Sequence, residues 1–400
     1  MLQFIRTTIA IQLAALALAV DAVTYVASTT YPIPTALNPV KQYTVPYNAG
    51  TMSRSVSVKA TTVLGPITDP SNGYSVFRDN GGSCTLGNRT FFTFADANAY
   101  VGGTWKTFKS AQSSFVTDFD TPEDMEDYTM STESGAFQAI PFTSAESAVS
   151  GSPSKRIAMW TWTNCIPLSS KKAMHFYSVQ QFTTSSHSYS LGNTMAVYTL
   201  TSTTDPTIDI TRASQIFFPN TTYGYGTFAS VVVNDTIYLY GVDSLYSGNY
   251  DVHVARVSKT AASDITSYQY YDAGTATWGS TMPVPTARRQ SAATVKGNMP
   301  FSTGTVYYSE YHNQYLMVFF NNWIDNKLRY NTAPTPLGPW TTSNQVLWVT
   351  PSGASYNYRA VAHPLIYASP GSTIGQKIAV HYSYQNGTFT YPMMGTVEFQ

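Results

Sequence analysis

Short runs of β-branched and aromatic residues recur along the chain, and each run is bounded by Gly, Asn, Asp or Pro. The 3.6-residue apolar spacing of an amphipathic helix is nearly absent. Runs of this length with such boundaries are typical of the strands of sandwiches, barrels and propellers. The pattern therefore predicts an all-β protein.

The predicted strands fall into five groups of three or four. The groups cover residues 74–95; 157–163, 173–183 and 194–201; 228–233, 236–240 and 252–257; 305–309, 315–321 and 327–331; and 360–367, 377–384 and 388–392. Groups that recur at intervals of about 60 to 80 residues are typical of propeller blades. We therefore expect a five-bladed β-propeller, and a large β-sandwich is the alternative.

The predicted propeller covers residues 61–400 as a single domain, because no Pro/Ser linker divides two cores. Residues 23–60 are expected to form an extension packed on the propeller. A strand near residues 61–67 is expected to close the ring, since closure removes exposed sheet edges.

Residues 1–22 have the pattern of a signal peptide: Arg6 precedes an apolar run over residues 9–20, and the small residue Ala22 ends a cleavage pattern. No later stretch reaches about 18 uninterrupted apolar residues, so no membrane anchor is expected. These features predict a secreted, extracellular protein.

Two further features suit this compartment. Four N-x-[ST] sequons lie beside predicted turns or strand ends, at Asn88, Asn220, Asn234 and Asn386. Only two cysteines are present, Cys84 and Cys165, and an even count in an oxidising compartment favours one disulfide over two free thiols.

Charge and aromatic content limit the possible partners. Lys plus Arg and Asp plus Glu both number 22, so nothing predicts attraction to nucleic acid or to an anionic membrane. The 30 Tyr, 20 Phe and 7 Trp suit stacking on sugars and equally suit a β core. We expect a neutral partner, a polysaccharide or oligosaccharide, and a monomer.

The chain contains no phosphate loop, no dinucleotide fingerprint and no H-E-x-x-H metal motif. We therefore expect no cofactor, with calcium on an axial or rim carboxylate as the alternative.

Three segments resemble five-bladed propeller glycoside hydrolases. They are Phe77-Arg78-Asp79-Asn80-Gly81-Gly82-Ser83 followed by Phe91-Phe92-Thr93-Phe94-Ala95-Asp96; residues 315–340, which end in Gly338-Pro339-Trp340; and Ala362-His363-Pro364-Leu365-Ile366. Taken together, these segments most resemble DUF-type propellers that include endo-D-arabinanases. They resemble arabinanase, arabinofuranosidase and fructosidase propellers more distantly. The resemblance covers residues 61–400 except residues 97–155.

Glycoside hydrolysis requires two carboxyl groups that face one sugar. The resemblance places Asp79 on the inner strand of the first blade, with capping of the Asn-Gly-Gly turn as the structural alternative. It places a second carboxyl at Asp96, which period-two alternation puts on the face of Phe92 and Phe94. A buried structural carboxylate is the alternative for Asp96. Weaker candidates for the partner carboxyl are Glu133, Asp243, Glu310 and Asp325.

Other residues are candidates for substrate binding, each with core packing as its alternative. His363 lies on the inner strand of the last blade in the resemblance, and Arg359 and Tyr358 precede it as possible hydroxyl-binding groups. Arg78 is a possible partner of a pocket carboxylate. The pairs Trp160 with Trp162 and Tyr223 with Tyr225 are possible sugar-stacking platforms.

Residues 118–127 are rich in acids. Thr121-Pro122-Glu123-Asp124 has the pattern of an N-cap followed by the first turn of a short surface helix. The alternative is a cation-binding or substrate-gating insertion.

The sequence thus predicts a secreted glycoside hydrolase that acts on a furanoside-containing, arabinan-like polysaccharide. A non-catalytic glycan-binding propeller, lectin-like or part of a cell wall, is the alternative. It needs aromatic platforms and amides but no paired acids.

Overall fold

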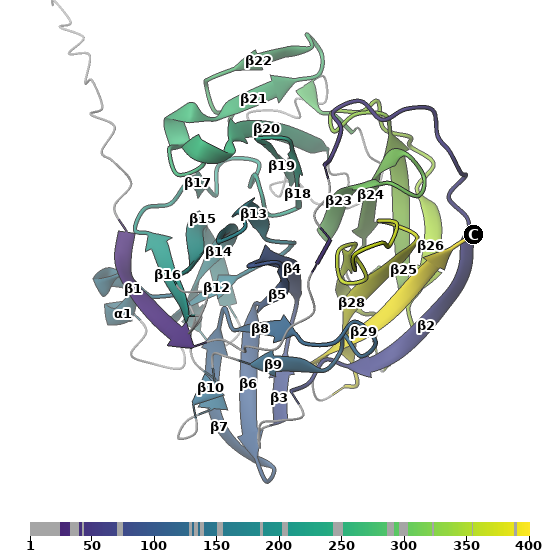
Figure 1. The fold of residues 1–400 in the computed structure, drawn as a ribbon. Coiled ribbons are helices and arrows are strands. Elements are labelled where there is room, and N and C mark those ends of the chain that lie inside the picture. Colours follow the sequence, from purple (N-terminus) through teal and green to yellow (C-terminus); the bar gives the residue numbers. More distant parts are fainter. Residues whose placement is uncertain are drawn as a thin grey trace, which may run out of the picture.

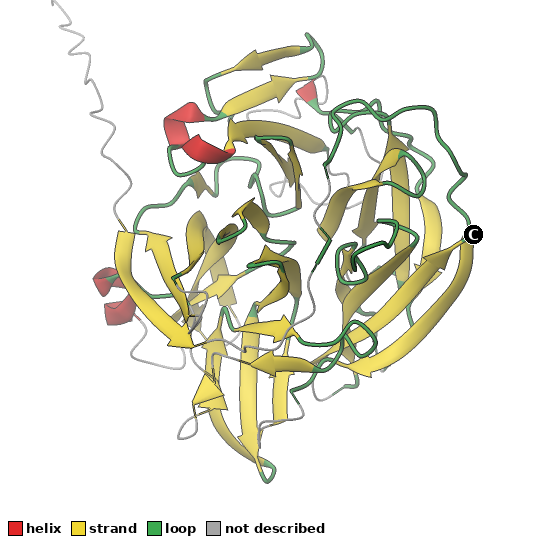
Figure 2. Cartoon of the chain, in the orientation of Figure 1, coloured by secondary structure: helices red, strands yellow, loops and turns green. Residues whose placement is uncertain are grey.

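The structure is a computed structural model that describes residues 25–32, 40–41, 44–69, 75–127, 130–131, 135–136, 140–149, 155–184, 187–201, 207–242, 251–285, 292–295, 303–321, 324–353, 355–387 and 390–400. The predicted signal peptide lies outside these residues. Strands dominate (Figure 2), beside one short helix, α1 (Ser144–Val149), and the 3-10 turns η1 (Lys259–Ala261) and η2 (Ile265–Ser267). The nearly all-β prediction is confirmed.

Five antiparallel sheets of four or more strands make up most of the described chain (Figure 1). The first consists of β4 (Gly81–Leu86), β5 (Arg89–Phe94), β8 (Ser113–Val116) and β9 (Met125–Asp127). The second consists of β1 (Tyr25–Pro32), β16 (Thr207–Ala213), β15 (His187–Leu200), β14 (Lys172–Thr184) and β12 (Arg156–Trp160), with β13 (Ile166–Ser169) on β14 and β17 (Phe218–Pro219) on β15.

The remaining three large sheets follow in chain order. The third contains β18 (Ala229–Val233), β19 (Thr236–Val242), β20 (Val252–Ser258), β21 (Gln269–Asp272) and β22 (Thr277–Gly279). The fourth contains β23 (Thr303–Ser309), β24 (Gln314–Phe320), β25 (Lys327–Ala333) and β26 (Gln345–Val349). The fifth contains β27 (Tyr358–His363), β28 (Lys377–Gln385), β29 (Thr390–Phe399) and β2 (Val58–Pro66).

One inner strand from each large sheet takes part in a closed ring. Strand β4 contacts β13, β13 contacts β18, β18 contacts β23, β23 contacts β27, and β27 contacts β4. Five apolar clusters fill the spaces between successive sheets, and the last of them joins the fifth sheet back to the first through Phe92, Phe94, Ala379 and Met394. Burial of these side chains between sheets holds the ring together.

The fifth sheet contains strands from distant parts of the chain. Strand β2 pairs with β29, from Val58 opposite Phe399 to Pro66 opposite Met393. It covers most of the segment expected to close the ring. The pairing covers one edge of β29, which would otherwise expose unpaired backbone groups.

A smaller sheet of β3 (Ser75–Arg78), β6 (Asp96–Val101) and β7 (Thr104–Ser110) projects beyond the ring (Figure 1). A two-stranded sheet of β10 (Met130–Ser131) and β11 (Gly135–Ala136) contacts it. Asn80 has a φ of 43° in the turn between β3 and β4, so the two strands part into different sheets. The prediction that residues 74–95 form one blade is therefore wrong for β3.

The predicted helix after Thr121 is also wrong. The chain turns there and enters β9, because Met125 is buried and its backbone N–H donates to the Thr68 carbonyl over 2.7 Å. The Thr68 N–H donates in turn to the Glu123 carbonyl over 2.9 Å. A cap signal alone does not stabilise so short a helix against burial and strand pairing.

Candidate active site

Asp79 and Asp96 come together where β3 ends and β6 begins. The backbone N–H of Asp96 donates to Asp79 Oδ1 over 3.0 Å, and the backbone N–H of Asp79 donates to the Asp96 carbonyl over 2.9 Å. The Tyr358 hydroxyl donates to Asp79 Oδ2 over 2.8 Å. Both carboxyl-bearing residues are half-buried. Asp79 is therefore oriented by one backbone and one side-chain donor, and neither donor belongs to the Asn-Gly-Gly turn, whose capping was the structural alternative for Asp79.

The two carboxyl groups have different environments. Burial raises the pKa of Asp96 well above its usual value, and the nearby charge of Asp79 raises it further, against weaker opposing effects of Arg156, Trp160 and Arg359. Asp96 Oδ1 accepts no hydrogen bond from the described residues. Asp96 thus favours its protonated form beside a carboxylate held by two donors.

The strand position of Asp96 differs from the prediction. Phe92 and Phe94 are fully buried on β5 between the first and fifth sheets, whereas Asp96 starts β6 in another sheet. The period-two pattern stops at Ala95, where the chain leaves β5. Asp96 therefore faces Asp79 and not the buried aromatic side chains.

Arg359 and Tyr358 approach the pair from β27. Arg359 has a φ of 54°, in the left-handed region that a non-glycine residue rarely adopts, beside an irregularity in the pairing of β27 with β28. Burial lowers the pKa of Arg359 to about 10, and the charges of Asp79 and Asp96 partly oppose this effect. The unusual backbone thus places a cation next to both carboxyl groups.

Two tryptophans form the neighbouring wall. The rings of Trp160 and Trp162 meet edge to face with centroids 5.5 Å apart, and both side chains are partly exposed. The Arg359 guanidinium lies 3.0 Å from the centroid of the Trp162 ring, so it covers one face of that ring. The predicted pair is therefore at this site, with Trp160 next to Asp96.

Arg78 and Asn80 lie behind the carboxyl pair, and both are buried. Arg78 Nε donates to Gln112 Oε1 over 2.7 Å, and its guanidinium lies 4.6 Å from the Phe94 ring centroid. Asn80 donates from its side chain to the Thr161 carbonyl. These contacts hold Arg78 against Phe94 of β5 and against Gln112, and they hold Asn80 against the segment before β13.

Gly82 lies where two parts of the backbone approach each other closely. A Cβ atom there would lie 1.9 Å from the Thr163 carbonyl oxygen. The glycine is therefore required because β4 packs directly on the segment before β13.

His363 is fully buried in a chain of polar contacts. Its Nδ1 lies 2.8 Å from the Ser83 hydroxyl, and its Nε2 lies 2.7 Å from His381 Nδ1. Burial and the neighbouring His381 lower its pKa well below the usual value. His363 thus lies at the end of β27, between Ser83 of β4 and His381 of β28, in a neutral polar network.

Tyr225 does not reach this site. It is 1% exposed in the cluster between the second and third sheets, and Tyr223 beside it stacks on His253 with centroids 3.7 Å apart. The expected sugar platform at Tyr223 and Tyr225 is corrected to a packed core, because neighbouring rings enclose both side chains.

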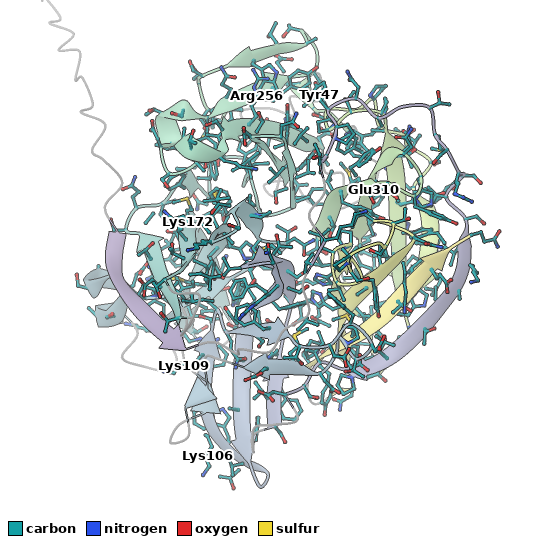
Figure 3. The ribbon with its side chains drawn as sticks, viewed as in Figure 1. Tyr47, Lys106, Lys109, Lys172, Arg256 and Glu310 are labelled. Carbon is teal, nitrogen blue, oxygen red and sulfur yellow. A yellow bond between two sulfur atoms is a disulfide. The ribbon has the colours of Figure 1, made fainter. Side chains whose placement is uncertain are left out.

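Two of the weaker carboxylate candidates take part in ion pairs with nearby cations. Glu310 accepts from Lys41 over 2.7 Å and lies far from Lys109 of β7 (Figure 3). Asp325 pairs with Arg329 over 2.6 Å. Glu133 and Asp243 lie outside the described residues.

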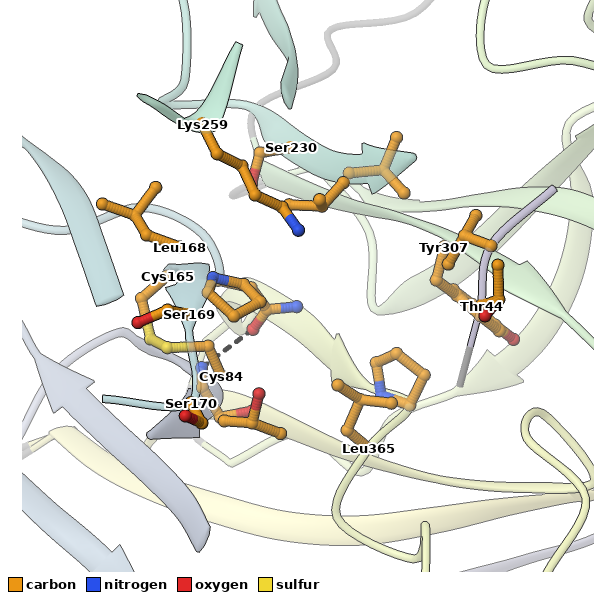
Figure 4. Close-up of a pocket in the computed structure, with 18 of the residues that line it drawn as sticks. Thr44, Cys84, Cys165, Leu168, Ser169, Ser170, Ser230, Lys259, Tyr307 and Leu365 are labelled. Carbon is orange, nitrogen blue, oxygen red and sulfur yellow. Dashed lines mark hydrogen bonds between the residues drawn. A yellow bond between two sulfur atoms is a disulfide. The ribbon is translucent and has the colours of Figure 1, made fainter. Parts of the chain in front are cut away.

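A cavity of about 520 Å³ occupies the other end of the inner strands (Figure 4). Its lining includes Thr44 from the segment before β2, together with Ser83, Asn164, Ser230, Thr305 and Lys259, and does not include Asp79 or Asp96. The Cys84–Cys165 disulfide forms part of its wall and confirms the predicted pairing. The carboxyl pair, with its perturbed pKa, remains the better candidate for chemistry.

Some general features bear on ligands and membranes. Within the described ranges, no helix is long and apolar enough to cross a membrane. No group of three His, Cys, Asp or Glu residues in the same part of the chain is arranged to hold a metal ion. The four sequon asparagines, Asn88, Asn220, Asn234 and Asn386, are exposed.

The chain is similar to several solved structures. A "putative hydrolase" from Bacteroides ovatus superposes with a TM-score of 0.60 at 17% identity, covering 84% of this chain and 86% of that one. A family 117 glycoside hydrolase from Zobellia galactanivorans has a TM-score of 0.46 at 11% identity and coverages of 84% and 89%. The GH43_1 enzyme from Xanthomonas citri, complexed with xylotriose, has a TM-score of 0.46 at 10% identity and coverages of 84% and 90%. Only the first superposition is close enough to establish a shared fold.

A search of curated protein sequences finds no match to this chain. A family model described as a domain of unknown function, DUF5005, matches residues 79–373, which include Asp79, Asp96, Tyr358, Arg359 and His363. This match covers well over half of the chain, and the chain therefore belongs to the DUF5005 family.

Proposed function

We propose that this protein is a secreted glycoside hydrolase, that its five large sheets are the blades of a five-bladed β-propeller, and that Asp79 and Asp96 are its paired carboxyl groups. One observation carries the proposal: a half-buried carboxyl with a raised pKa lies beside a carboxylate that two donors orient. Two carboxyl groups whose environments favour different protonation states are what acid–base hydrolysis of a glycoside requires.

The environments assign a role to each group. Asp96 gives its proton to the glycosidic oxygen as the bond from that oxygen to the anomeric carbon breaks. Asp79, whose carboxyl group two donors orient, either takes a proton from the attacking water or bonds to the anomeric carbon until water replaces it. Arg359 lies close enough to stabilise both carboxylate forms. The Trp160 and Trp162 walls supply apolar surface for a sugar ring.

The substrate class that we propose is a furanoside-containing, arabinan-like polysaccharide. It rests on the resemblance of the segments around Asp79 and His363 to propeller enzymes of that kind. The equal numbers of acidic and basic residues support a neutral glycan over a polyanion.

The test compares the wild type with Asp79→Asn and Asp96→Asn on arabinan, D-arabinan, xylan, fructan and galactan. We expect hydrolysis of a furanoside polymer, and a loss in each variant of about 10²- to 10⁴-fold, the usual contribution of a general acid or base. Asp118→Asn is the matched control, because Asp118 is an exposed carboxylate in a turn, and it should leave the rate unchanged. Full activity in Asp79→Asn would contradict the assignment.

Glycan binding without hydrolysis is the second candidate, and one observation favours it. Both oxygens of Asp79 already accept hydrogen bonds within the protein, as in a structural carboxylate. Binding of a polysaccharide that the wild type never cleaves would establish this function instead.

Secretion and glycosylation form a separate part of the proposal. The exposure of the four sequon asparagines leaves room for N-glycans. Expression in a eukaryotic secretory host, followed by enzymatic removal of N-glycans, should give a lower apparent mass in the medium fraction. Replacing any one of the four sequon asparagines with Gln should reduce this difference in apparent mass by the contribution of one glycan.

A further inference from the structure

The small sheet that carries both carboxyl groups has one open face. In its register Phe77 pairs with Asn98, and Asn98 pairs with Phe108. Tyr100 pairs with Trp105 on the same ladder. Paired residues point to the same side of an antiparallel sheet, and residues two apart on a strand also share a side. Asp96, Asn98 and Tyr100 therefore form one continuous row that leads away from Asp79.

Burial separates the two faces of this sheet. Val76, Ala97 and Ala99 form an apolar cluster on one face, and both alanines are fully buried. On the other face Phe77, Asn98 and Tyr100 are partly exposed. Trp105 is 54% exposed at the far end of that face. The face that continues from the carboxyl pair is thus the open one.

The exposed tryptophan is held by its neighbours. The Trp105 indole N–H donates to Asn98 Oδ1 over 3.3 Å. Nearby, the Phe77 and Tyr100 rings meet edge to face with centroids 5.2 Å apart. The Phe77 ring also contacts Tyr391 of β29, with centroids 5.1 Å apart. Rings held in place lose little side-chain entropy when a ligand binds, which favours their use as a binding surface.

Charged groups lie at the inner end of this face and along β7: the Arg156 guanidinium lies 4.2 Å from the centroid of the Phe108 ring, and exposed Lys106 lies beside Trp105 where the register shifts. Asp79 and Asp96 lie at the inner end, whereas Lys109 pairs with Ala97 and so belongs to the covered face. Aromatic rings with an amide between them can stack on the apolar faces of sugars and hydrogen-bond their hydroxyls. At about 3.3 Å per residue, the row from Asp96 to Tyr100 spans about 13 Å, which is longer than one sugar ring.

We propose that this open face, formed by Phe77, Asn98, Tyr100 and Trp105, binds the continuation of a glycan chain whose reacting unit lies at Asp79 and Asp96. The inference deepens the proposed function and rests on it for the identity of the inner end. It specifies a polymer as the natural substrate, because the row has room for more than one sugar unit. The projection of β3, β6 and β7 beyond the ring is then part of substrate binding (Figure 1).

The test is Trp105→Ala, with Trp105→Phe as the conservative variant. Tyr47→Ala is the matched control, since Tyr47 is a 39% exposed aromatic that packs near Tyr238 and lies far from the β7 end of the molecule (Figure 3). Kinetics are measured on the polysaccharide that the wild type cleaves best and on a chromogenic glycoside of the same single sugar. Binding is measured separately by affinity electrophoresis in the five polysaccharides named above.

We expect Trp105→Ala to raise KM for the polysaccharide and to weaken its binding about 3- to 10-fold, the usual effect of one aromatic contact. Its kcat/KM on the chromogenic glycoside should equal that of the wild type. Trp105→Phe should recover most of the polysaccharide binding. Tyr47→Ala should leave the kinetics on both substrates unchanged. Unchanged polymer binding in Trp105→Ala would overturn the proposal, as would an equal loss on both substrates or a wild type that binds none of the polysaccharides.

The outcomes also separate this inference from the proposed function. If Asp79→Asn and the wild type both fail to hydrolyse any polymer while Trp105→Ala still weakens binding, the catalytic proposal fails and the binding face stands. If hydrolysis depends on Asp79 but not on Trp105, the catalytic proposal stands and the binding face is rejected.

Discussion

The carboxylate of Asp79 accepts the backbone N–H of Asp96 over 3.0 Å. The residue that orients Asp79 therefore also carries the carboxyl group whose ionisation Asp79 disfavours. A change at either residue should affect both the protonation and the position of the other, which makes this pair the first target for experiment.

Asp96→Asn should stabilise the folded protein at neutral pH while slowing hydrolysis about 10²- to 10⁴-fold. The folded-state pKa of Asp96 is raised by burial and by Asp79, so its contribution to stability is fully present below the unfolded-state pKa of about 4 and is lost as pH rises through the folded-state value. An amide removes this cost, since each unit of pKa difference corresponds to about 1.4 kcal/mol. Thermal unfolding at pH 5 and pH 7 measures the effect. A lower Tm than that of the wild type at pH 7 would contradict it.

The pH dependence of kcat/KM should be bell-shaped. One limb should reflect the carboxyl group that acts as base or nucleophile, and activity should fall at higher pH as Asp96 loses the proton that it donates. The alkaline limb should reflect the raised pKa of Asp96. A chromogenic glycoside with a good leaving group needs less proton assistance, so its alkaline limb should be shallower. Identical profiles for good and poor leaving groups would argue against Asp96 as the acid.

Moderate acid should destabilise the protein through its buried histidines. Burial lowers the pKa of His175 to about 3 and that of His381 to about 3, against an unfolded value of about 6.5. The unfolded state thus binds more protons between these limits, and stability decreases as pH falls from about 6.5 towards 3. Urea unfolding at pH 7, 6, 5 and 4 measures the slope. His175→Gln should lower this slope by about one proton, and an unchanged slope would show that His175 does not contribute.

Glu146→Gln should destabilise the protein because Arg212 is fully buried. Arg212 Nη2 donates to Glu146 Oε1 over 2.7 Å, and a second contact joins Nη1 to Oε2. Burial raises the pKa of Glu146, but the hydrogen bonds and charge of Arg212 outweigh burial and lower it overall. The stabilisation from this ion pair is present above the pKa of Glu146 in the unfolded state, and it is lost as pH falls through the pKa of Glu146 in the folded state.

Breaking such a buried pair costs about 3–5 kcal/mol. Denaturant unfolding of Glu146→Gln at pH 7 should show this loss, and the double variant Glu146→Leu with Arg212→Met should recover most of it. A single variant as stable as the wild type would show that the pair contributes little.

Removal of the disulfide should lower stability without changing the fold. Cys84 and Cys165 close a loop with a sequence separation of 81, which in the chain-entropy model corresponds to about 4–5 kcal/mol. The Cys84→Ser and Cys165→Ser double variant should show this shift in denaturant unfolding, and reduced wild type should match it. Equal stability of oxidised and reduced wild type would contradict the prediction.

The parts of the fold that were predictable from sequence are those set by local patterns. Runs of β-branched and aromatic residues bounded by turn residues located three strands in each of the second to fifth sheets, with β19 and β24 predicted to within a few residues. The number of cysteines and the compartment gave the Cys84–Cys165 pairing. These signals are local or need only counting, so tertiary contacts do not change them.

Most of the parts that were missed depend on contacts between distant residues. Helix α1 is the exception, because its sequence signal is local. Helix α1 has a capping box in which Thr143 and Glu146 bond each other's backbone N–H groups, and the T-x-x-E pattern was a signal for it. The turn at Asn80 was recognisable from Asn-Gly-Gly, but the separation of β3 into a small projecting sheet and the burial of Tyr225 have no comparable sequence signature. Asp79 and Asp96 were each chosen from the resemblance, but their contact follows from the pairing of β3 with β6, which a single sequence does not show.

The pairing of β2 with β29 has a consequence for the order of folding. The fifth sheet is complete only after residue 399 has been synthesised and has paired with residue 58. During synthesis, the earlier sheets can therefore form while the ring is still open, with the edges of β4 and β27 not yet in contact. A high fraction of such distant contacts slows folding and leaves strand edges exposed for longer. The chain is therefore most exposed to aggregation before β29 has been synthesised and paired with β2.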